Sequence, residues 1–199
     1  ELKSFKEGLF HVQDPCSVKA AEAGVNALKS SKASDEPLII DVCAAPGGKS
    51  ICAAQRFPRG TVIACDISEK KADLIRENRE RLGLENMDIR VHDALIFDGD
   101  LKERADLVIA DLPCSGIGVI GEKPDIKFRL RKNDIACLKK LQQDILETSA
   151  GYVRPGGILV YSTCTVCRAE NEDNAIWFEQ HFPFEMISME QMLPAEGSG

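Results

Sequence analysis

Short apolar runs alternate with longer amphipathic stretches along most of the chain. Apolar runs open the segments 37–57, 60–84, 87–97 and 105–119, and a further run forms 157–164. Strands that alternate with helices in this way are typical of parallel βαβ units with right-handed crossovers. The pattern therefore predicts an α/β fold that is doubly wound and Rossmann-like, with a mostly parallel sheet and helices on both faces.

The helices show recognisable start and stop signals. Asp14-Pro15 combines an N-cap residue with proline at the first helical position, which predicts a helix to about Leu28. Gly83 closes a second amphipathic helix. Further helices are predicted within 37–57, 134–157 and 169–181. The apolar positions in 184–189 are compatible with a sixth strand.

The same pattern divides the chain into two regions. Residues 1–36 are predicted to form an N-terminal helical lead-in segment that packs on the following domain, and 37–199 form the α/β domain itself. A polar stretch over 30–36 joins the two. The sequence contains no internal repeat or low-complexity tract that would indicate further modules.

Composition and charge narrow the class of protein. Hydrophobic residues make up 44% of the chain, which is enough for a continuous core. No apolar run approaches the roughly 18–20 residues of a membrane span, and the charged N-terminus does not resemble a signal peptide. The eight cysteines are scattered through strand-like and helix-like segments, so we expect reduced thiols, a cytoplasmic location and no membrane partner. The net charge of −7 is unlike that of most nucleic-acid-binding proteins.

Polar side chains follow the predicted strands. In doubly wound sheets, ligands bind beyond the carboxyl ends of the strands. Carboxylates stand at or just after the ends of the first four strands, and thiols follow the fourth and fifth: Asp41, Asp66, Asp93, Asp111, Cys114 and Cys164. We therefore expect these groups to converge on one edge of the sheet.

The loop from Cys43 to Lys49 is a candidate cofactor site. Its Gly47-Gly48 turn allows a ligand to approach the backbone, and the following helix directs free N–H groups towards an anion. Asp66 lies about 20 residues further on, where an acidic residue binds a ribose hydroxyl pair in such folds. This spacing favours a cofactor that contains adenosine, although a tight β–α turn and a helix N-cap would explain the loop and the aspartate separately.

Among such cofactors, S-adenosylmethionine fits the loop best. NAD is disfavoured because the loop is not G-x-G-x-x-G, and ATP is disfavoured because it is not G-x-x-x-x-G-K-[ST]. S-adenosylmethionine presents a carboxylate to the helix N-terminus and a ribose to Asp66.

The cysteines that follow strands four and five allow several interpretations. Each alone is compatible with a buried structural thiol, and Cys164-x-x-Cys167 is compatible with a redox pair or half of a zinc site. The chain has no second CxxC, and its three histidines are isolated in sequence, so we expect no metal. A dithiol oxidoreductase would require a reversible disulfide between Cys164 and Cys167.

Several motifs together carry a family resemblance. The stretches "FKEGLFHVQDPCS", "DVCAAPGGKS", "ADLPCSGIGVI", "KPDIKFRL", "LQQDIL" and "VRPGGILVYSTCTVCRAENED" resemble the Sun/RsmB-type RNA cytosine-5 methyltransferases from about Phe5 to Leu193. The helical stretch 123–146 is most similar to the bacterial small-subunit rRNA enzymes, and tRNA-directed relatives share much of it. The resemblance implies that 37–199 is a methyltransferase catalytic domain.

The resemblance implies a covalent mechanism and a set of site residues. Cys164 would attack carbon 6 of cytosine, Cys114 would assist product release, and Asp111 would hold the base with Lys49 close by. DNA cytosine methyltransferases place their nucleophile on the Pro-Cys element, so the opposite assignment of the two cysteines stays open. The positions that match cofactor contacts are Cys43, Ala44, Ala45, Pro46, Gly47, Gly48, Lys49, Asp66, Asp93 and Asp111.

A basic segment offers a place for RNA despite the acidic total charge. It contains Lys123, Lys127, Arg129 and Arg131 and directly follows the Cys114 loop. Phosphate binding depends on local cations, and the reacting base must leave any stack, so we expect this segment to follow the RNA backbone beside a flipped-out cytosine. We expect a monomer that acts on rRNA rather than tRNA; a non-catalytic cofactor-binding module for ribosome assembly is the alternative of a different class.

Two parts of the family's full-length enzymes are not recognised in the sequence. These enzymes carry an N-terminal helical RNA-binding domain and an aromatic-rich strand after the Leu-Pro found here as Leu193-Pro194. Because the chain also begins without methionine, we expect it to be a piece of a longer protein.

Overall fold

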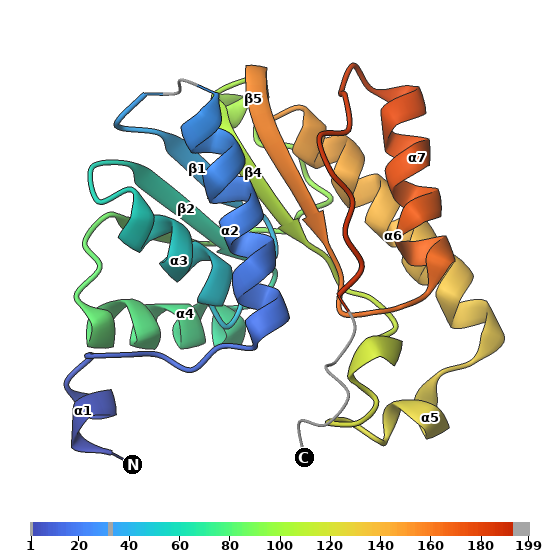
Figure 1. Cartoon of the computed structure of the whole chain (residues 1–199), viewed down its shortest axis with the longest axis horizontal. Helices are drawn as coiled ribbons and strands as arrows, with labels where there is room; N and C mark the ends of the chain where they lie inside the picture. Colours follow the sequence, from blue (N-terminus) through green and yellow to red (C-terminus); the bar gives the residue numbers. More distant parts are fainter. Residues whose placement is uncertain (1, 32–33, 193–199) are drawn as a thin grey trace. The chain divides into compact units, whose positions relative to one another are not determined.

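A five-stranded parallel sheet forms the centre of the fold in the computed structural model, which describes residues 2–31 and 34–192 (Figure 1). Its strands are β1 (Leu38–Asp41), β2 (Thr61–Asp66), β3 (Met87–Val91), β4 (Ala105–Asp111) and β5 (Val153–Ser162). They are arranged in the order β3-β2-β1-β4-β5. Strands β2 and β3 are thus added on one side of β1, and β4 and β5 on the other side. The predicted doubly wound α/β fold is confirmed.

Seven α-helices are described. They are α1 (Lys3–Lys6), α2 (Pro15–Ser30), α3 (Gly48–Arg56), α4 (Glu69–Leu82), α5 (Ile126–Arg129), α6 (Lys132–Ala150) and α7 (Glu172–His181), with short 3-10 turns at Gly99–Leu101, Ile117–Val119 and Arg168–Glu170. Within the described residues, no helix combines the length and apolar character needed to cross a membrane.

The predicted helix signals are found in place. The Asp14 carboxylate accepts a hydrogen bond from the Ser17 N–H at 2.9 Å and caps α2, with Pro15 at the first position. Gly83 ends α4 with a φ of 64°, a left-handed conformation that glycine adopts without strain. These local choices orient the helices that lead into and away from the sheet edge.

Two compact units make up the chain: Glu1–Asp111 with Thr148–Val160, and Leu112–Glu147 with Tyr161–Gly199. We refer to them as unit 1 and unit 2. The core of unit 1 lies on one face of the sheet, where alternate strand residues such as Ile39, Val62 and Leu107 pack against α2, α3 and α4. All three strand residues are fully buried.

The start of the chain is fastened to the end of α4 in unit 1. The Arg81 guanidinium donates hydrogen bonds to the carbonyls of Phe5 and Phe10 at 2.9 Å and lies 3.9 Å from the centre of the Phe5 ring. Gly8 has a φ of 72°, and a Cβ there would lie 1.8 Å from the Arg81 carbonyl oxygen. These contacts direct residues 11–17 towards the loop that follows β1.

Two elements differ from the sequence prediction. The helix predicted over 134–157 ends at Ala150, because β5 already begins at Val153. The sixth strand suggested for 184–189 is wrong: this stretch has no regular structure. The Phe184 ring packs on Phe178 of α7 and the Met186 N–H donates to the Glu179 carboxylate, so contacts with a helix replace pairing with a strand. The last strand expected after Leu193-Pro194 lies outside the described residues.

Candidate active site

The loop after β1 approaches its neighbours closely at two glycines. Gly47 precedes α3 with a φ of 108°, and a Cβ there would lie 3.2 Å from the Ile75 side chain. A Cβ on Gly48 would lie 2.9 Å from the side-chain amide of Gln13. Gly47 therefore requires glycine for its conformation, whereas a larger residue at Gly48 would displace the Gln13 side chain.

A cavity of about 480 Å³ opens beside this loop within unit 1. Its walls combine the strand ends, the loop and the start of the chain, and include Asp41, Cys43, Ala44, Ala45, Pro46, Gly48, Lys49 and Asp111 together with His11, Gln13 and Ser17. The structure thus brings together most of the predicted cofactor-binding residues. Asp66 and Asp93 are not among the residues that line this cavity.

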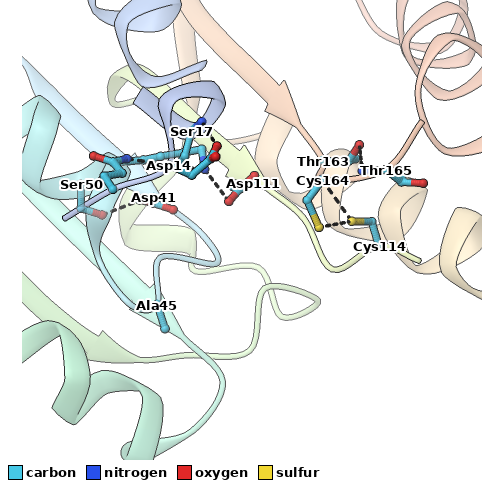
Figure 2. A network of polar contacts seen from close by, with 12 residues as sticks. Asp14, Ser17, Asp41, Ala45, Ser50, Asp111, Cys114, Thr163, Cys164 and Thr165 are labelled. Atoms are coloured by element: carbon cyan, nitrogen blue, oxygen red, sulfur yellow. Dashed lines mark hydrogen bonds and ion pairs between the residues drawn. The ribbon is translucent and has the colours of Figure 1, made fainter. Parts of the chain in front are cut away.

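Asp41 contributes a buried carboxyl group to the cavity. Its Oδ2 accepts a hydrogen bond from the Ser50 hydroxyl at 2.6 Å, whereas Oδ1 has no hydrogen-bond partner among the described residues (Figure 2). Burial raises the pKa of this carboxyl group to about 7. A buried acceptor without a partner suits the ammonium group of a cofactor such as S-adenosylmethionine.

Asp66 is held in place by backbone and side-chain donors of unit 1. Its Oδ2 accepts from the Ala45 N–H at 3.1 Å, and its Oδ1 accepts from the Ile67 N–H at 2.8 Å and lies 3.2 Å from Lys71 Nζ. The hydroxyl of Ser68 caps α4, so Asp66 does not serve as that N-cap. Its contact with the loop supports a joint role in cofactor binding, and ribose binding stays a prediction.

Asp93 stands in the loop after β3. Its carboxylate accepts a hydrogen bond from the Leu95 N–H at 3.0 Å, which shapes the turn that follows the strand. The structure places it at the predicted strand end, and its contact with a cofactor stays a prediction.

Lys49 and Asp111, which the family resemblance implied to lie close together, form an ion pair. Lys49 Nζ lies 2.7 Å from Asp111 Oδ2 and donates to the Ser17 hydroxyl at 2.8 Å. Ser17 also accepts from the Gln13 side-chain amide at 3.1 Å, and Gln13 is bonded to His11. The lead-in segment therefore orients Lys49, a role that sequence reasoning missed because serine near a helix start is explained by capping alone.

The two candidate thiols meet within unit 2. The Sγ atoms of Cys114 and Cys164 lie 3.1 Å apart, and the Cys164 N–H donates to Cys114 Sγ at 3.2 Å (Figure 2). The hydrogen bond with Cys164 and, secondarily, burial raise the pKa of the Cys114 thiol well above its usual range. Cys114 therefore keeps its proton at neutral pH, and Cys164 is the more exposed of the two.

Glycine allows the two thiol loops to approach each other. A Cβ on Gly118 would lie 2.8 Å from the carbonyl oxygen of Cys164, and Gly116 has a φ of 69°. Any larger residue at Gly118 would push the loop after β4 away from the loop after β5. This explains the spacing of glycines in "PCSGIG".

A buried glutamate links the same two loops. Glu170 Oε2 accepts from the Ser115 N–H at 2.9 Å and from the Gln142 side-chain amide at 3.0 Å. The Ser115 hydroxyl in turn is bonded to the Thr165 hydroxyl at 2.8 Å. Sequence reasoning missed Glu170, because nothing in "RAENED" distinguishes the one fully buried acid from the acids around it.

Cys167 does not pair with Cys164 in the described structure. Its backbone N–H donates to the Thr165 hydroxyl at 3.1 Å, and the sulfur that contacts Cys164 belongs to Cys114. The contact between Thr165 and Cys167 thus shapes a turn after β5.

The predicted RNA-binding residues are exposed on unit 2. Lys127 and Arg129 belong to α5, with Lys123 before it and Arg131 after it. Arg129 lies 3.3 Å from Asp125 on the same helical turn. An exposed pair of this kind is weak and leaves the arginine able to bind another anion.

Residues 27–190 match the model of the 16S rRNA methyltransferase RsmB/F family. The chain belongs to this family. The suspected membership is confirmed, and with it the fold of class I S-adenosylmethionine-dependent methyltransferases and S-adenosylmethionine as the cofactor.

Curated relatives of the family come from several bacteria. The chain is 39% identical over 194 residues to the probable ribosomal RNA small subunit methyltransferase B of Bacillus subtilis (strain 168), covering 96% of this chain and 42% of the relative. It is 36% identical over 191 residues to ribosomal RNA small subunit methyltransferase B of Yersinia enterocolitica, covering 94% and 42%. The chain thus spans less than half the length of the relatives it matches.

Solved structures of similar proteins share the fold. A methyltransferase homolog protein from Pyrococcus horikoshii is 30% identical, with a TM-score of 0.80 over 98% of this chain and 59% of the other. NSun6 from Pyrococcus horikoshii with SFG is 32% identical, with a TM-score of 0.76 over 90% of this chain and 44% of the other.

Proposed function

We propose that this RsmB/F-family chain is the catalytic domain of an RNA methyltransferase that transfers a methyl group from S-adenosylmethionine to carbon 5 of a cytosine in rRNA. The observation that carries the proposal is the pair of thiols, Cys114 and Cys164, whose Sγ atoms lie 3.1 Å apart. A structural cysteine does not need such a partner, whereas a nucleophile that forms and breaks a bond does.

The chemistry explains why a thiol is needed. Carbon 5 of cytosine is a poor nucleophile until a thiolate adds at carbon 6 and turns the ring into an enamine-like species. S-adenosylmethionine supplies an electrophilic methyl group on its sulfonium. Loss of the proton from carbon 5 then restores the double bond and expels the thiolate.

Cys164 is the proposed nucleophile and Cys114 its partner in product release. Cys164 is the more exposed thiol, so a base can reach it. The S–H group of Cys114 can donate to Cys164 Sγ, which stabilises Cys164 as a thiolate before attack and again when the adduct breaks.

Asp111 and Lys49 are proposed to hold the cytosine. The Asp111 carboxylate accepts from Lys49 at 2.7 Å and retains part of its surface for the exocyclic amine and N3 of the base. A carboxylate at this edge favours protonation at N3, which makes carbon 6 more open to attack. The loop from Cys43 to Lys49, with Asp66 and Asp93, is proposed to bind the cofactor.

The proposed substrate is rRNA rather than tRNA. Both curated relatives are named as methyltransferases of the small ribosomal subunit. Methylation of tRNA by the same chemistry is the closest alternative.

The test is a covalent adduct with RNA that carries 5-fluorocytidine, because fluorine at carbon 5 blocks the final elimination. The complete protein, S-adenosylmethionine and rRNA or tRNA fragments would be combined and analysed on denaturing gels. Wild type is expected to form an adduct, Cys164→Ala to form none, and Cys114→Ala to accumulate one even with ordinary cytidine. Loss of the adduct only in Cys114→Ala would reverse the two roles, and no adduct in wild type despite cofactor binding would contradict the proposal.

A further inference from the structure

Phe128 on α5 has an unusual setting. Its side chain is 90% exposed, more than any other large apolar side chain in the described residues. A single exposed ring is common on protein surfaces and by itself indicates nothing. The charges around Phe128 and the anchoring of its helix give the ring its significance.

Cations flank Phe128 in the sequence. Between Glu122 and Lys132 the sequence holds five Lys and Arg residues and two acidic residues, in a chain with a net charge of −7. Lys127 and Arg129 flank Phe128 directly, and both are exposed. An aromatic ring between cations, on an otherwise acidic protein, is complementary to a nucleic acid strand.

The helix that carries the ring is anchored beside the thiol pair, within unit 2. Ile126 packs over Gly116: a Cβ on Gly116 would lie 3.0 Å from Ile126 Cδ1 and 3.9 Å from Cys164 Sγ. Residues two positions apart project to roughly opposite sides of a helix, about 200° apart. The contact that turns Ile126 towards the thiols therefore turns Phe128 away from the protein.

We propose that Phe128 stacks on an unpaired nucleobase next to the target cytidine, while Lys127 and Arg129 contact the adjoining phosphates. This inference rests on the proposed function and specifies its substrate as single-stranded or loop RNA. When the target base leaves the stack, its neighbour loses a stacking partner, and an aromatic side chain can replace that partner. The cations hold the backbone on either side without reading its sequence.

The test separates stacking from phosphate contacts. With the complete protein, the affinity for a short single-stranded RNA would be measured across a range of salt concentrations, with 2-aminopurine placed beside the cytidine. Phe128→Ala is expected to weaken binding by at least about ten-fold and to leave the salt slope unchanged. Lys127→Ala is expected to lower the slope by ~0.7. Phe128→Tyr should bind like wild type and keep the quenching of 2-aminopurine.

Ile187→Ala is the matched control, since Ile187 is a 72% exposed apolar residue of the same unit. Equal RNA affinities of Phe128→Ala and Ile187→Ala would overturn the inference. It would also be overturned if Phe128→Ala weakened binding to a continuous RNA duplex as much as binding to single-stranded RNA. Unchanged RNA affinity of Phe128→Ala together with weaker binding of a protein partner would overturn it as well. The adduct assay at saturating RNA distinguishes the two proposals: Phe128→Ala still forms the Cys164 adduct if the proposed function holds, whereas no adduct in wild type contradicts the function whatever Phe128 does.

Discussion

Two single residues, Cys114 and Asp41, have environments that change their ionisation. Cys114 keeps its proton because a second thiol lies 3.1 Å away and because it is partly buried. Asp41 resists ionisation for a different reason, since burial removes the water that would solvate its charge. The first group is suited to donating a hydrogen bond to a leaving thiolate, and the second to receiving a positive group.

Asp41 gives a prediction about pH. Binding of an ammonium group requires the carboxylate form, so cofactor binding should release a proton, and the affinity should rise about ten-fold per pH unit below 7 and level off above it. Asp41→Asn should bind more weakly and show little of this dependence. Calorimetry in buffers with different ionisation enthalpies measures the proton release directly, and a flat wild-type profile from pH 5 to 8 would contradict the prediction.

The same raised pKa affects stability with a definite sign. The folded state binds the Asp41 proton more tightly than the unfolded state, whose carboxyl titrates near ~3.9. The contribution of Asp41 to stability is therefore fully present below that value and is lost as pH rises to about 7, the pKa in the folded protein. In denaturant unfolding, Asp41→Asn should not show this loss of stability with rising pH. In wild type, the nearby Lys49 favours the carboxylate and therefore makes the loss of stability smaller.

At the scale of elements, the loops that follow β4 and β5 are joined by buried polar contacts within unit 2. Glu170 satisfies the Ser115 N–H of one loop and the Gln142 amide of α6, and the Ser115–Thr165 contact completes the link. The thiols stand one residue before Ser115 and one residue before Thr165. Glu170 therefore ties together the two loops that carry the thiols.

Glu170→Ala tests this link. It removes the acceptor of the buried Ser115 N–H and one of the two acceptors of the Gln142 amide, which also donates to the Pro113 carbonyl, so we expect a loss of stability of about 1–3 kcal/mol in denaturant unfolding. We also expect slower thiolate alkylation of Cys164, because Cys114 no longer lies at hydrogen-bond distance. Glu170→Gln keeps one acceptor and should show a smaller effect, and the exposed Glu185→Ala should show neither change. A destabilised variant with unchanged Cys164 reactivity would leave Glu170 a purely structural role.

The elements also show what sequence can and cannot predict. The strand ends were predictable from apolar runs, and parallel strands bring their carboxyl ends to one edge, so the meeting of Cys114 and Cys164 followed from topology. The closeness of Lys49 to Asp111 was implied by the family resemblance instead. The burial of Glu170 and the contact of Ser17 with Lys49 depend on packing between distant segments, which leaves no local signal. The sixth strand was wrong because alternation over 184–189 also suits a segment that packs on α7.

The whole molecule divides its candidate chemistry between two compact units. The loop from Cys43 to Lys49, Asp41, Asp66 and the Lys49–Asp111 pair belong to unit 1. The thiol pair, Glu170 and the cations of α5 belong to unit 2. Changes in the charge of α5 should therefore act on RNA without altering the residues proposed for S-adenosylmethionine.

Charge reversal of Lys127, Arg129 and Arg131 to Glu tests this separation. The triple variant should lose RNA affinity, and the slope of log affinity against log salt should fall by about 2 if each cation contacts one phosphate of a single strand. Cofactor affinity should stay at the wild-type value, because none of the three residues lines the unit 1 cavity. Reversal of Lys102, Arg104 and Lys139, which are not part of this segment, is the control for a change of net charge alone. Equal losses of RNA affinity in both variants would show that total charge, rather than the surface around Phe128, governs RNA binding.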